Sequence, residues 1–412
     1  MDMDTSGALK PDRLRPRGSS QGGLRQYNER VVLQAVRLHG ALPGADIARL
    51  TGLTAQTVSL ITKRLLDDGL LIKGEPQRGK VGQPSVPLSL NPDGAYAIGV
   101  KLGRRSMDVV LVDFVGAVRQ RYSVDYAHAD PEQLLPEIAQ RLKDIRRRLG
   151  PARRDALQGI GIAAPLNLGG WQALLGLPPA VAAKWRQIDL AQEVARLTEL
   201  PVTLVKDTAA ATVAELIAGR GRSVKSFLYV FVDTFIGGGL VLDSHLRGGL
   251  SGNAGAIGSL PLWTATPRSD HRPPQLLSVA SLLTLERAWA AAGLDSGAAA
   301  DMRALQPPWL PHTRAWLAEA AAAIAQAVQS AACLLDLEGA ILDGSFSREL
   351  LAALLDETTL ALARYDWEGV AHPQLLAGTI GSDARALGGA LLPLYANFAP
   401  DRDLFLKGDA NA

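Results

Sequence analysis

The sequence predicts an α/β protein in which a winged helix-turn-helix precedes two α/β lobes that face a cleft. Two observations predict this fold class. Three short amphipathic segments followed by a pair of apolar strands occupy residues 28–90. From Tyr96 on, strands and helices alternate, and a strand-turn-strand-turn-strand pattern near residue 100 returns near residue 230. Such a repeat indicates an internal duplication, so we expect each copy to build one lobe.

The composition is that of a folded, multidomain protein. The chain has 412 residues, of which 47% are hydrophobic and 20% charged, so two or three domains with real cores are expected. The single cysteine, Cys333, excludes a disulfide framework and a multi-cysteine zinc site, and we expect no metal. A reducing cytoplasm fits best. The apolar stretch 316–337 contains Glu319 and Asp336, which favours a buried helix over a membrane span, so no membrane partner is expected.

The N-terminal end of the chain is basic. Residues 1–90 carry 13 Lys and Arg against 8 Asp and Glu, whereas the remainder carries 30 against 33. This asymmetry suggests an anionic partner, although surplus arginines in a flexible tail would give the same numbers. Residues 1–26 are rich in Arg, Gly, Ser and Pro and lack apolar periodicity, so we expect a disordered arm there.

A DNA-binding domain is expected over residues 27–90. Thr54 is a suitable N-cap for the last of three helices, and Gly52 ends the one before it. The helices are expected at residues 31–38, 43–50 and 55–68. Two short strands that enclose a polar turn follow, at residues 70–72 and 86–90. This order is typical of a winged helix-turn-helix, and the alternative is a helical trio that serves only dimerisation.

The third helix has the polar outer face of a recognition helix. Gln pairs with adenine through two hydrogen bonds, Ser and Thr contact bases or phosphates, and Lys and Arg favour phosphates. A merely solvated helix face is the alternative. The expected DNA contacts are Thr54, Gln56, Thr57, Ser59, Lys63 and Arg64 on the helix, and Arg78, Lys80 and Gln83 in the wing.

The two lobes are expected to span residues 91–220, with about 385–412 returning to the first lobe, and residues 221–384. The strands of the first copy are expected at residues 96–102, 106–112, 118–124, 159–163 and 202–205. Those of the second copy are expected at residues 226–232, 238–242, 245–247, 340–342 and 376–379. Loops at the strand ends should meet in the cleft, which is the default ligand site.

Several segments in this order resemble the ROK family of repressors and sugar kinases. They are GIGIAAP at 159–165, Trp185, LVKDTAAA at 204–211, IGGGLVL at 236–242, GNAGAIG at 252–258 and residues 384–391. The resemblance implies an actin-like, ribonuclease-H-type fold of two lobes. With a winged helix-turn-helix in front, the chain resembles the family's transcriptional-regulator branch.

The sequence departs from the kinase pattern at the positions that serve catalysis. The acidic residue of the D-x-G-x-T phosphate loop is replaced by Lys101, and the G-T-G of the nucleotide loop by Asp-Thr-Phe at 233–235. The sugar-binding Glu is replaced by Ala256, and the family's C-x-C-G-x-x-G-C zinc stretch is missing. We therefore expect a chain that is not an enzyme and that binds no cofactor.

Four residues are expected to contact a small-molecule effector. The resemblance places Asp207 where the kinases keep the base that accepts the sugar hydroxyl proton, although a helix N-cap role explains it equally well. Lys206 replaces the family's Asn, and it either neutralises Asp207, pairs with an acidic or phosphorylated ligand, or lies free at the surface. Asn253 and Ser259 lie in the segment that contacts sugar in the kinases.

The sequence therefore predicts a cytoplasmic transcriptional regulator, expected to be a repressor, that senses a sugar or related metabolite. Its expected partners are a double-stranded DNA operator, a small sugar-like effector and further copies of the chain, in a homodimer or homotetramer. Two alternatives stay open. One is an active ATP-dependent sugar kinase with a DNA-binding appendage, and the other is a DNA-binding dimer that responds to no ligand.

Overall fold

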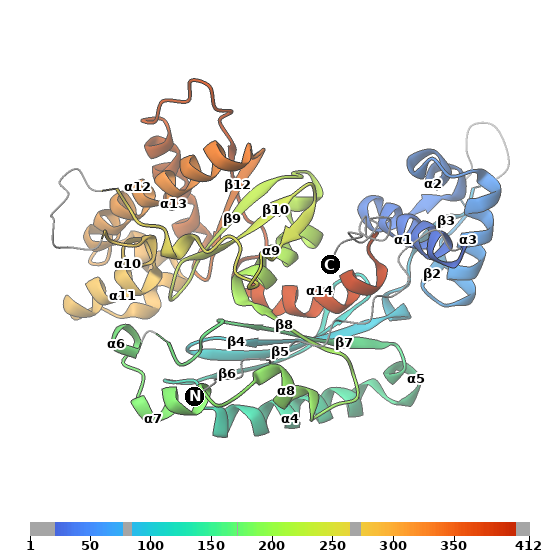
Figure 1. The fold of residues 1–412 in the computed structure, drawn as a ribbon, viewed down its shortest axis with the longest axis horizontal. Helices are drawn as coiled ribbons and strands as arrows, with labels where there is room; N and C mark the ends of the chain where they lie inside the picture. Colours follow the sequence, from blue (N-terminus) through green and yellow to red (C-terminus); the bar gives the residue numbers. More distant parts are fainter. Residues whose placement is uncertain (1–20, 77–84, 171, 264–272, 401–412) are drawn as a thin grey trace, which may run out of the picture. The chain divides into compact units, whose positions relative to one another are not determined.

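The computed structural model describes residues 21–76, 85–170, 172–263 and 273–400. The chain divides into two compact units, which we call the N-terminal module (Met1–Gly94 with Tyr395–Ala412) and the two-lobed unit (Ala95–Leu394). Figure 1 follows the chain from the helices of the module through the two lobes to the C-terminal helix.

The N-terminal module is a winged helix-turn-helix. Its helices are α1 (Gln21–His39), α2 (Gly44–Thr51) and α3 (Ala55–Asp67). Val32, Val36, Ile47, Val58 and Ile61 are buried between them. The strands β1 (Leu42–Pro43), β2 (Leu71–Lys73) and β3 (Pro87–Leu90) form an antiparallel sheet in the order β1-β3-β2. The wing strands are thus paired as expected, and the turn between them, residues 77–84, lies outside the described residues.

The first helix begins earlier than the sequence indicates. Residues 21–26 belong to α1, so the expected arm of residues 1–26 is wrong for its last six residues, and residues 1–20 lie outside the described part. Once Val32, Leu33 and Val36 fix the later turns of α1 against the core, each further residue at its start gains a hydrogen bond at small entropic cost. Arg25 and Glu29, one turn apart and 4.0 Å from each other, lie along this extension.

The C-terminal helix α14 (Ala384–Phe398) crosses from one unit to the other. Its residues up to Leu394 belong to the two-lobed unit, whereas Tyr395 and the residues after it belong to the N-terminal module. Within the module, Nη1 of Arg30 on α1 donates to the carbonyl of Ala399 (3.3 Å). The expectation that residues 385–412 return to the first lobe is therefore wrong for residues 395–400, and residues 401–412 lie outside the described part.

The first lobe is built on a five-stranded sheet in the order β6-β5-β4-β7-β8. The strands are β4 (Tyr96–Leu102), β5 (Ser106–Asp113), β6 (Val118–Asp125), β7 (Leu157–Ala164) and β8 (Val202–Lys206). One face packs against α4 (Pro131–Leu149), α7 (Pro179–Trp185) and α8 (Leu190–Ala195), in a core that includes Ile98, Ile138 and Trp185. The lobe also carries the short helices α5 (Pro151–Arg154) and α6 (Gln172–Leu175).

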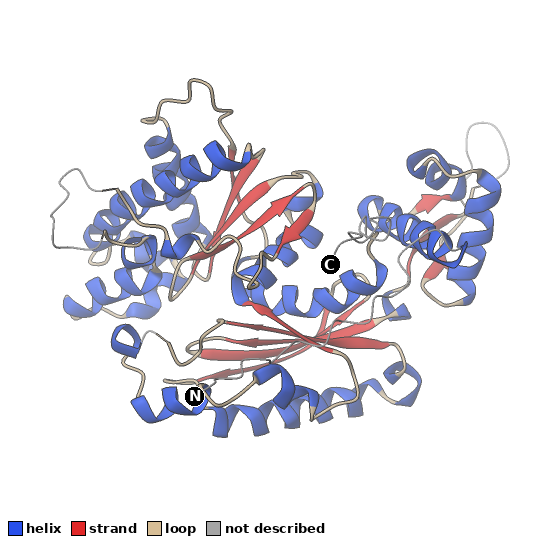
Figure 2. Ribbon diagram, viewed as in Figure 1, coloured by secondary structure: helices blue, strands red, loops and turns tan. Residues whose placement is uncertain are grey.

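The second lobe repeats the first. Its sheet has the order β11-β10-β9-β12-β13, and in both sheets two antiparallel pairs precede two parallel pairs. The strands are β9 (Phe227–Val232), β10 (Gly237–Leu242), β11 (His245–Arg247), β12 (Gly339–Gly344) and β13 (Gln374–Ala377). The internal duplication inferred from the sequence is therefore confirmed, and Figure 2 shows both sheets with their flanking helices.

Four helices pack on one face of the second sheet: α10 (Leu276–Ala280), α11 (Leu282–Ala291), α12 (Leu310–Leu335) and α13 (Arg348–Leu362). By length and composition alone, α12 would suffice to cross a membrane. Half of its apolar window is nevertheless buried, and Trp316, Ile324 and Val328 lie in the core of the lobe. The core of a folded lobe accounts for this apolar helix, as the sequence indicates.

Helices α9 (Asp207–Ala218) and α14 lie between the two sheets (Figure 1). Glycines allow a very close approach there. A Cβ atom on Gly161 of β7 would lie 1.9 Å from the carbonyl oxygen of Gly389 on α14, and one on Gly388 would lie 1.7 Å from that of Ala210 on α9. Any larger residue would push these elements apart. The tight packing fixes the first turns of both helices, Asp207 and Arg385 included, at the cleft between the lobes.

Candidate functional site

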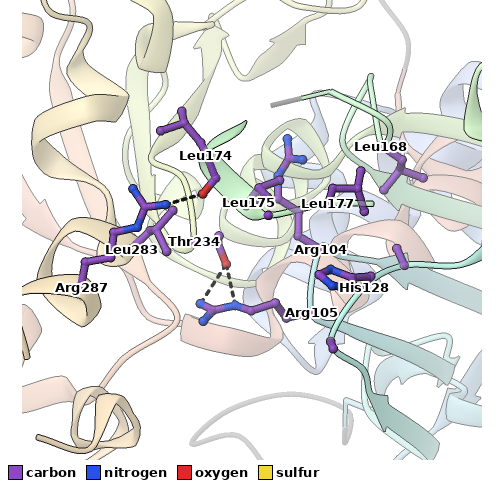
Figure 3. Close-up of a pocket in the computed structure, with 13 residues that line it drawn as sticks. Arg104, Arg105, His128, Leu168, Leu174, Leu175, Leu177, Thr234, Leu283 and Arg287 are labelled. Atoms are coloured by element: carbon purple, nitrogen blue, oxygen red, sulfur yellow. Dashed lines mark hydrogen bonds between the residues drawn. The ribbon is translucent and has the colours of Figure 1, made fainter. Parts of the chain in front are cut away.

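Two equivalent hairpin turns, one from each lobe, meet across the cleft. The β4–β5 turn of the first lobe carries Arg105, whose Nε and Nη2 donate to Oγ1 of Thr234 in the β9–β10 turn (3.2 and 3.0 Å). The same guanidinium forms two hydrogen bonds with the carboxylate of Glu286 on α11 (2.8 and 3.0 Å). Figure 3 shows the bonds to Thr234. Arg105 therefore holds the two lobes together at the turns.

Lys101 stands at the position of the phosphate-loop acid of the kinases, and its ammonium group is already bound to protein partners. Nζ of Lys101 lies 3.1 Å from the carboxylate of Asp108 and also donates to Ser106 Oγ. Burial lowers the pKa of Lys101 below its ordinary value, and the charge of Arg385 lowers it further. A buried cation at this position offers no ligand to a phosphate-bound Mg²⁺, because metal ions of this kind need carboxylate oxygens or water.

The second departure from the kinase pattern, Asp233, is neutralised in the structure. Its carboxylate forms an ion pair with Arg385 in the first turn of α14. Although burial raises the pKa of Asp233, the charges of Arg385 and Lys101 outweigh it and hold this pKa below its ordinary value. An isolated carboxylate at this position would repel phosphate, but the neighbouring Arg385 offsets the charge of Asp233. The ring of Phe235, in the same turn, lies under the guanidinium of Arg104 at 4.8 Å.

All four residues expected to contact an effector line one cavity of about 250 Å³. We call it the effector cavity. Lys206 and Asp207 lie at the end of β8 and the start of α9, and Asn253 and Ser259 lie in the segment after β11. Gly255 makes this segment possible, since its φ is +73° and a Cβ there would lie 2.7 Å from Cα of Gly239. The volume matches a single sugar ring better than a nucleotide, because drug-sized pockets span roughly 300–1,000 Å³.

Asp207 is not an N-cap. It is the first residue of α9, the N-cap position belongs to Lys206, and Oδ1 of Asp207 accepts a hydrogen bond from the backbone N–H of Thr208 (2.8 Å). Nζ of Lys206 lies 3.4 Å from the carbonyl oxygen of Gly238. Burial lowers the pKa of Lys206, and the Asp207 carboxylate opposes this change. The Asp207 carboxylate therefore borders the cavity beside a desolvated cation.

A second hollow of about 390 Å³ adjoins the effector cavity and shares Arg104 and Thr234 with it. Figure 3 shows its apolar wall, made by Leu168, Leu174, Leu175, Leu177 and Leu283. Nη2 of Arg287 donates to the carbonyl of Leu174 (2.5 Å). Arg104, Arg105 and Arg385 were not among the site residues expected from the sequence. Adjacent arginines in a tight turn between two predicted strands were the available signal for the first two.

The start of the recognition helix has the predicted cap. Oγ1 of Thr54 accepts a hydrogen bond from the backbone N–H of Thr57 (3.2 Å), and the two hydroxyl oxygens lie 2.8 Å apart. Thr54 and Thr57 therefore bond to each other within the free module. Gln56, Ser59 and Lys63 are exposed along the outer face.

Two residues on α3 differ from the expectation. Nη1 of Arg64 lies 2.6 Å from Glu29 on α1, so Arg64 is engaged inside the module. Leu60, which is not among the expected DNA contacts, is 65% exposed on the same helix. An apolar side chain there suits the methyl group of thymine. Arg78, Lys80 and Gln83 lie outside the described residues.

Comparison with known proteins decides the family. The profile of the ROK family matches residues 97–395, which is most of the chain. The protein belongs to the ROK family.

The uncharacterised protein y4fQ of Sinorhizobium fredii is 26% identical over 376 residues, 90% of this chain and 91% of that protein. The xylose repressor of Caldicellulosiruptor bescii is 27% identical over 237 residues, 57% of this chain and 58% of the repressor. The DNA-binding transcriptional repressor Mlc of Escherichia coli is 22% identical over 54% of this chain and 55% of Mlc.

Solved structures share the ROK fold. A ROK family transcriptional regulator described as a homologue of Escherichia coli Mlc superposes with a TM-score of 0.65 at 20% identity, over 91% of this chain and 98% of that one. A ROK family glucokinase from Streptomyces griseus, solved with glucose and AMPPNP, gives a TM-score of 0.55 at 20% identity, over 72% of this chain and 99% of the kinase. The regulator match covers a larger share of this chain than the kinase match does.

The ROK zinc stretch has no counterpart in the described part of this chain. Among the described residues, no three His, Cys, Asp or Glu side chains gather as a metal site. The segment that follows Ser259 instead forms an isolated bridge between Pro261 and Gln275, and residues 264–272 lie outside the description.

Proposed function

We propose that this ROK protein is a DNA-binding transcriptional regulator, acting as a repressor, whose kinase-type cleft binds a sugar or sugar derivative without phosphorylating it. The observation that carries the proposal is the pairing of Lys101 with Asp108 at the phosphate-loop position. A cleft whose metal-binding acid has become a buried, ion-paired lysine has lost a component that phosphoryl transfer needs. The helix-turn-helix with its exposed polar recognition helix supports the DNA-binding part of the proposal.

The DNA contacts we propose are made by α3. Gln56 reads a base edge, Ser59 contacts a base or a phosphate, and Lys63 contacts a phosphate. Thr54 and Thr57 position the helix start, where backbone N–H groups favour a phosphate. One winged module buries little surface, so specific binding needs a homodimer or homotetramer on two half-sites about one helical turn, or a multiple of it, apart.

The effector cavity suits a small polyhydroxylated ligand. Asp207, Asn253 and Ser259 offer acceptors and donors to sugar hydroxyls, and Lys206 adds a cation. Names of similar proteins, which include xylose repressors, favour a sugar as well. No cofactor takes part in this function. A DNA operator as the partner supports a cytoplasmic location.

The test is ligand-dependent operator binding by the full-length chain. Selection from random duplexes defines the operator, and fluorescence anisotropy then gives its affinity with and without a panel of sugars. We expect a specific operator and at least one sugar that lowers the affinity. Formation of a sugar phosphate from ATP would instead establish the kinase. An operator whose affinity no ligand alters would establish a regulator without an effector.

A further inference from the structure

We propose that the effector carries a negatively charged group, a carboxylate or a phosphate, and that Arg104 binds it. This inference rests on the proposed function and narrows its ligand to an anionic sugar derivative. Arg104 lies in the β4–β5 turn of the first lobe and lines the effector cavity together with Lys206 and Asp207.

Among the described residues, no carboxylate forms an ion pair with Arg104, although the charges of Asp207 and Asp233 act on it. Its Nη1 is buried and makes no hydrogen bond with the described residues, and its guanidinium lies over the ring of Phe235. The neighbouring arginines of the cleft already form ion pairs, Arg105 with Glu286 and Arg385 with Asp233. In Figure 3, Arg104 and Arg105 point in different directions, and of these two side chains only Arg105 is joined to another residue by dashed lines. A buried donor without an acceptor costs free energy, and more so in a charged group, so a ligand that accepts its hydrogen bond would recover that cost.

The charges that line the effector cavity leave a positive surplus. Arg385 and Asp233 cancel each other as an ion pair. The remaining charges are the cations Arg104 and Lys206 against the single carboxylate of Asp207. A neutral sugar would leave this surplus unbalanced in a partly desolvated cleft, whereas one negative group balances it.

Burial already acts against both cations. It lowers the pKa values of Arg104 and Lys206 below their ordinary values, and the Asp207 carboxylate partly opposes this for each of them. A bound anion would favour the charged forms again. The guanidinium also fits the planar carboxylate and the phosphate better than an ammonium does, because its N–H groups form a rigid fork.

Arg104 stands where three hollows meet. It lines the effector cavity, the leucine-walled hollow and a third hollow of about 380 Å³ at the phosphate-loop position. In the third hollow Lys101 and Arg121 are already paired with Asp108 and Asp383. The anionic group is therefore expected at the Arg104 end of the effector cavity, with the sugar hydroxyls toward Asp207.

The test compares neutral and anionic forms of one sugar. Titration calorimetry in phosphate-free buffer measures the affinities of the full-length protein for D-glucose, D-glucuronate and D-glucose 6-phosphate. A pentose pair, neutral D-xylose and anionic D-xylonate, is measured in the same way. We expect one anionic form to bind at least about tenfold more tightly than its neutral parent. Glucuronate against glucose 6-phosphate tells a carboxylate from a phosphate.

Variants assign the preference to Arg104. Arg104→Met should reduce the tenfold preference to nearly none while leaving the affinity for the neutral sugar within about threefold, and Arg104→Lys should restore part of it. Arg287→Met is the matched control, because it removes the same charge from the neighbouring hollow only. Thermal unfolding shows whether each variant is folded.

The outcomes separate the two proposals. Neutral sugars that bind as tightly as their anionic forms, or a preference that survives in Arg104→Met, would overturn the anion proposal and leave the regulator intact. If none of these compounds binds the protein or alters its operator affinity, both the anion proposal and the proposed sugar-sensing function are wrong.

Discussion

Arg385, in the first turn of α14, forms an ion pair with Asp233, in the turn between β9 and β10. Arg385 is only 7% exposed, and its Nη2 also donates to Ser345 Oγ (3.2 Å). The pair joins a helix packed on the first lobe to a turn of the second. Both side chains also line the effector cavity. The stability of the paired lobes and the net charge around a bound effector therefore depend on the same two residues.

The ion pair makes stability depend on pH at the acidic end. Arg385 and Lys101 hold the pKa of Asp233 below its ordinary value despite burial, so the stabilisation is present above about pH 4 and is lost as pH falls through the native pKa. Asp233→Asn should cost about 3 kcal/mol at pH 7, because it leaves Arg385 buried without its partner. Unfolding by urea from pH 3 to 7 should show the difference between wild type and variant shrinking below pH 4. Parallel curves would contradict this assignment.

Gln56→Ala should relax operator specificity. If Gln56 binds adenine through two hydrogen bonds, its loss removes about 1–3 kcal/mol of discrimination at one base pair of each half-site. Repeating the selection from random duplexes with the variant should give the same site with one degenerate position. Leu60→Ala, which removes the exposed apolar side chain next to it, should weaken preference for thymine at a different position. An unchanged site in Gln56→Ala would move the base contacts away from the start of α3.

Lys63→Ala should weaken binding to every duplex alike. A phosphate contact releases counterions, so its loss should flatten the dependence of log affinity on log salt by about one unit per half-site. Anisotropy titrations between 50 and 200 mM salt on operator and random DNA measure the two slopes. Lys225→Ala, in the second lobe, is the control and should leave both slopes as they are. If Lys63→Ala lowers the affinity for the operator much more than the affinity for random DNA, Lys63 contacts a base instead.

Asp207→Ala should uncouple the effector from DNA. Because Asp207 lines the effector cavity and lies outside the N-terminal module, operator affinity without effector should stay within about twofold of wild type. The effector's influence, a coupling of about 1–3 kcal/mol in such proteins, should disappear. Anisotropy with the sugar identified in the panel measures both. A variant that responds like wild type would place the ligand elsewhere.

No phosphoryl transfer is expected from the purified protein. With Lys101 at the phosphate-loop position, incubation with ATP, Mg²⁺ and glucose, xylose or N-acetylglucosamine should form no sugar phosphate above the blank. Mass spectrometry of the products provides the sensitivity. Product that appears with wild type and is lost in Asp207→Asn would show that the chain is a kinase after all.

The sequence was sufficient for the parts of the fold that local pattern determines. The strands β4 and β11 have the predicted bounds, and Thr54 caps α3 as expected. Alternation of apolar residues and an N-cap hydroxyl act over a few residues, so they are visible in the chain itself. The same holds for the position of Asp207 at the end of a strand.

What the sequence did not show depends on distant contacts. Arg385 and Asp233 lie 152 positions apart in the numbering, and nothing near either residue indicates the other. Arg104 differs from Arg105 only in what folding places beside each of them. The end of α14 was assigned to the first lobe because helix periodicity says nothing of the core against which a helix packs.

The hydrogen bond from Arg30 to Ala399 has a consequence for synthesis of the protein. The DNA-binding module includes residues from the last turn of α14, so its helices leave the ribosome before either lobe while its remaining piece follows both of them. A nascent or truncated chain that ends within the lobes lacks that piece. The part of the protein that touches the operator is thus made before the lobes and completed only after them.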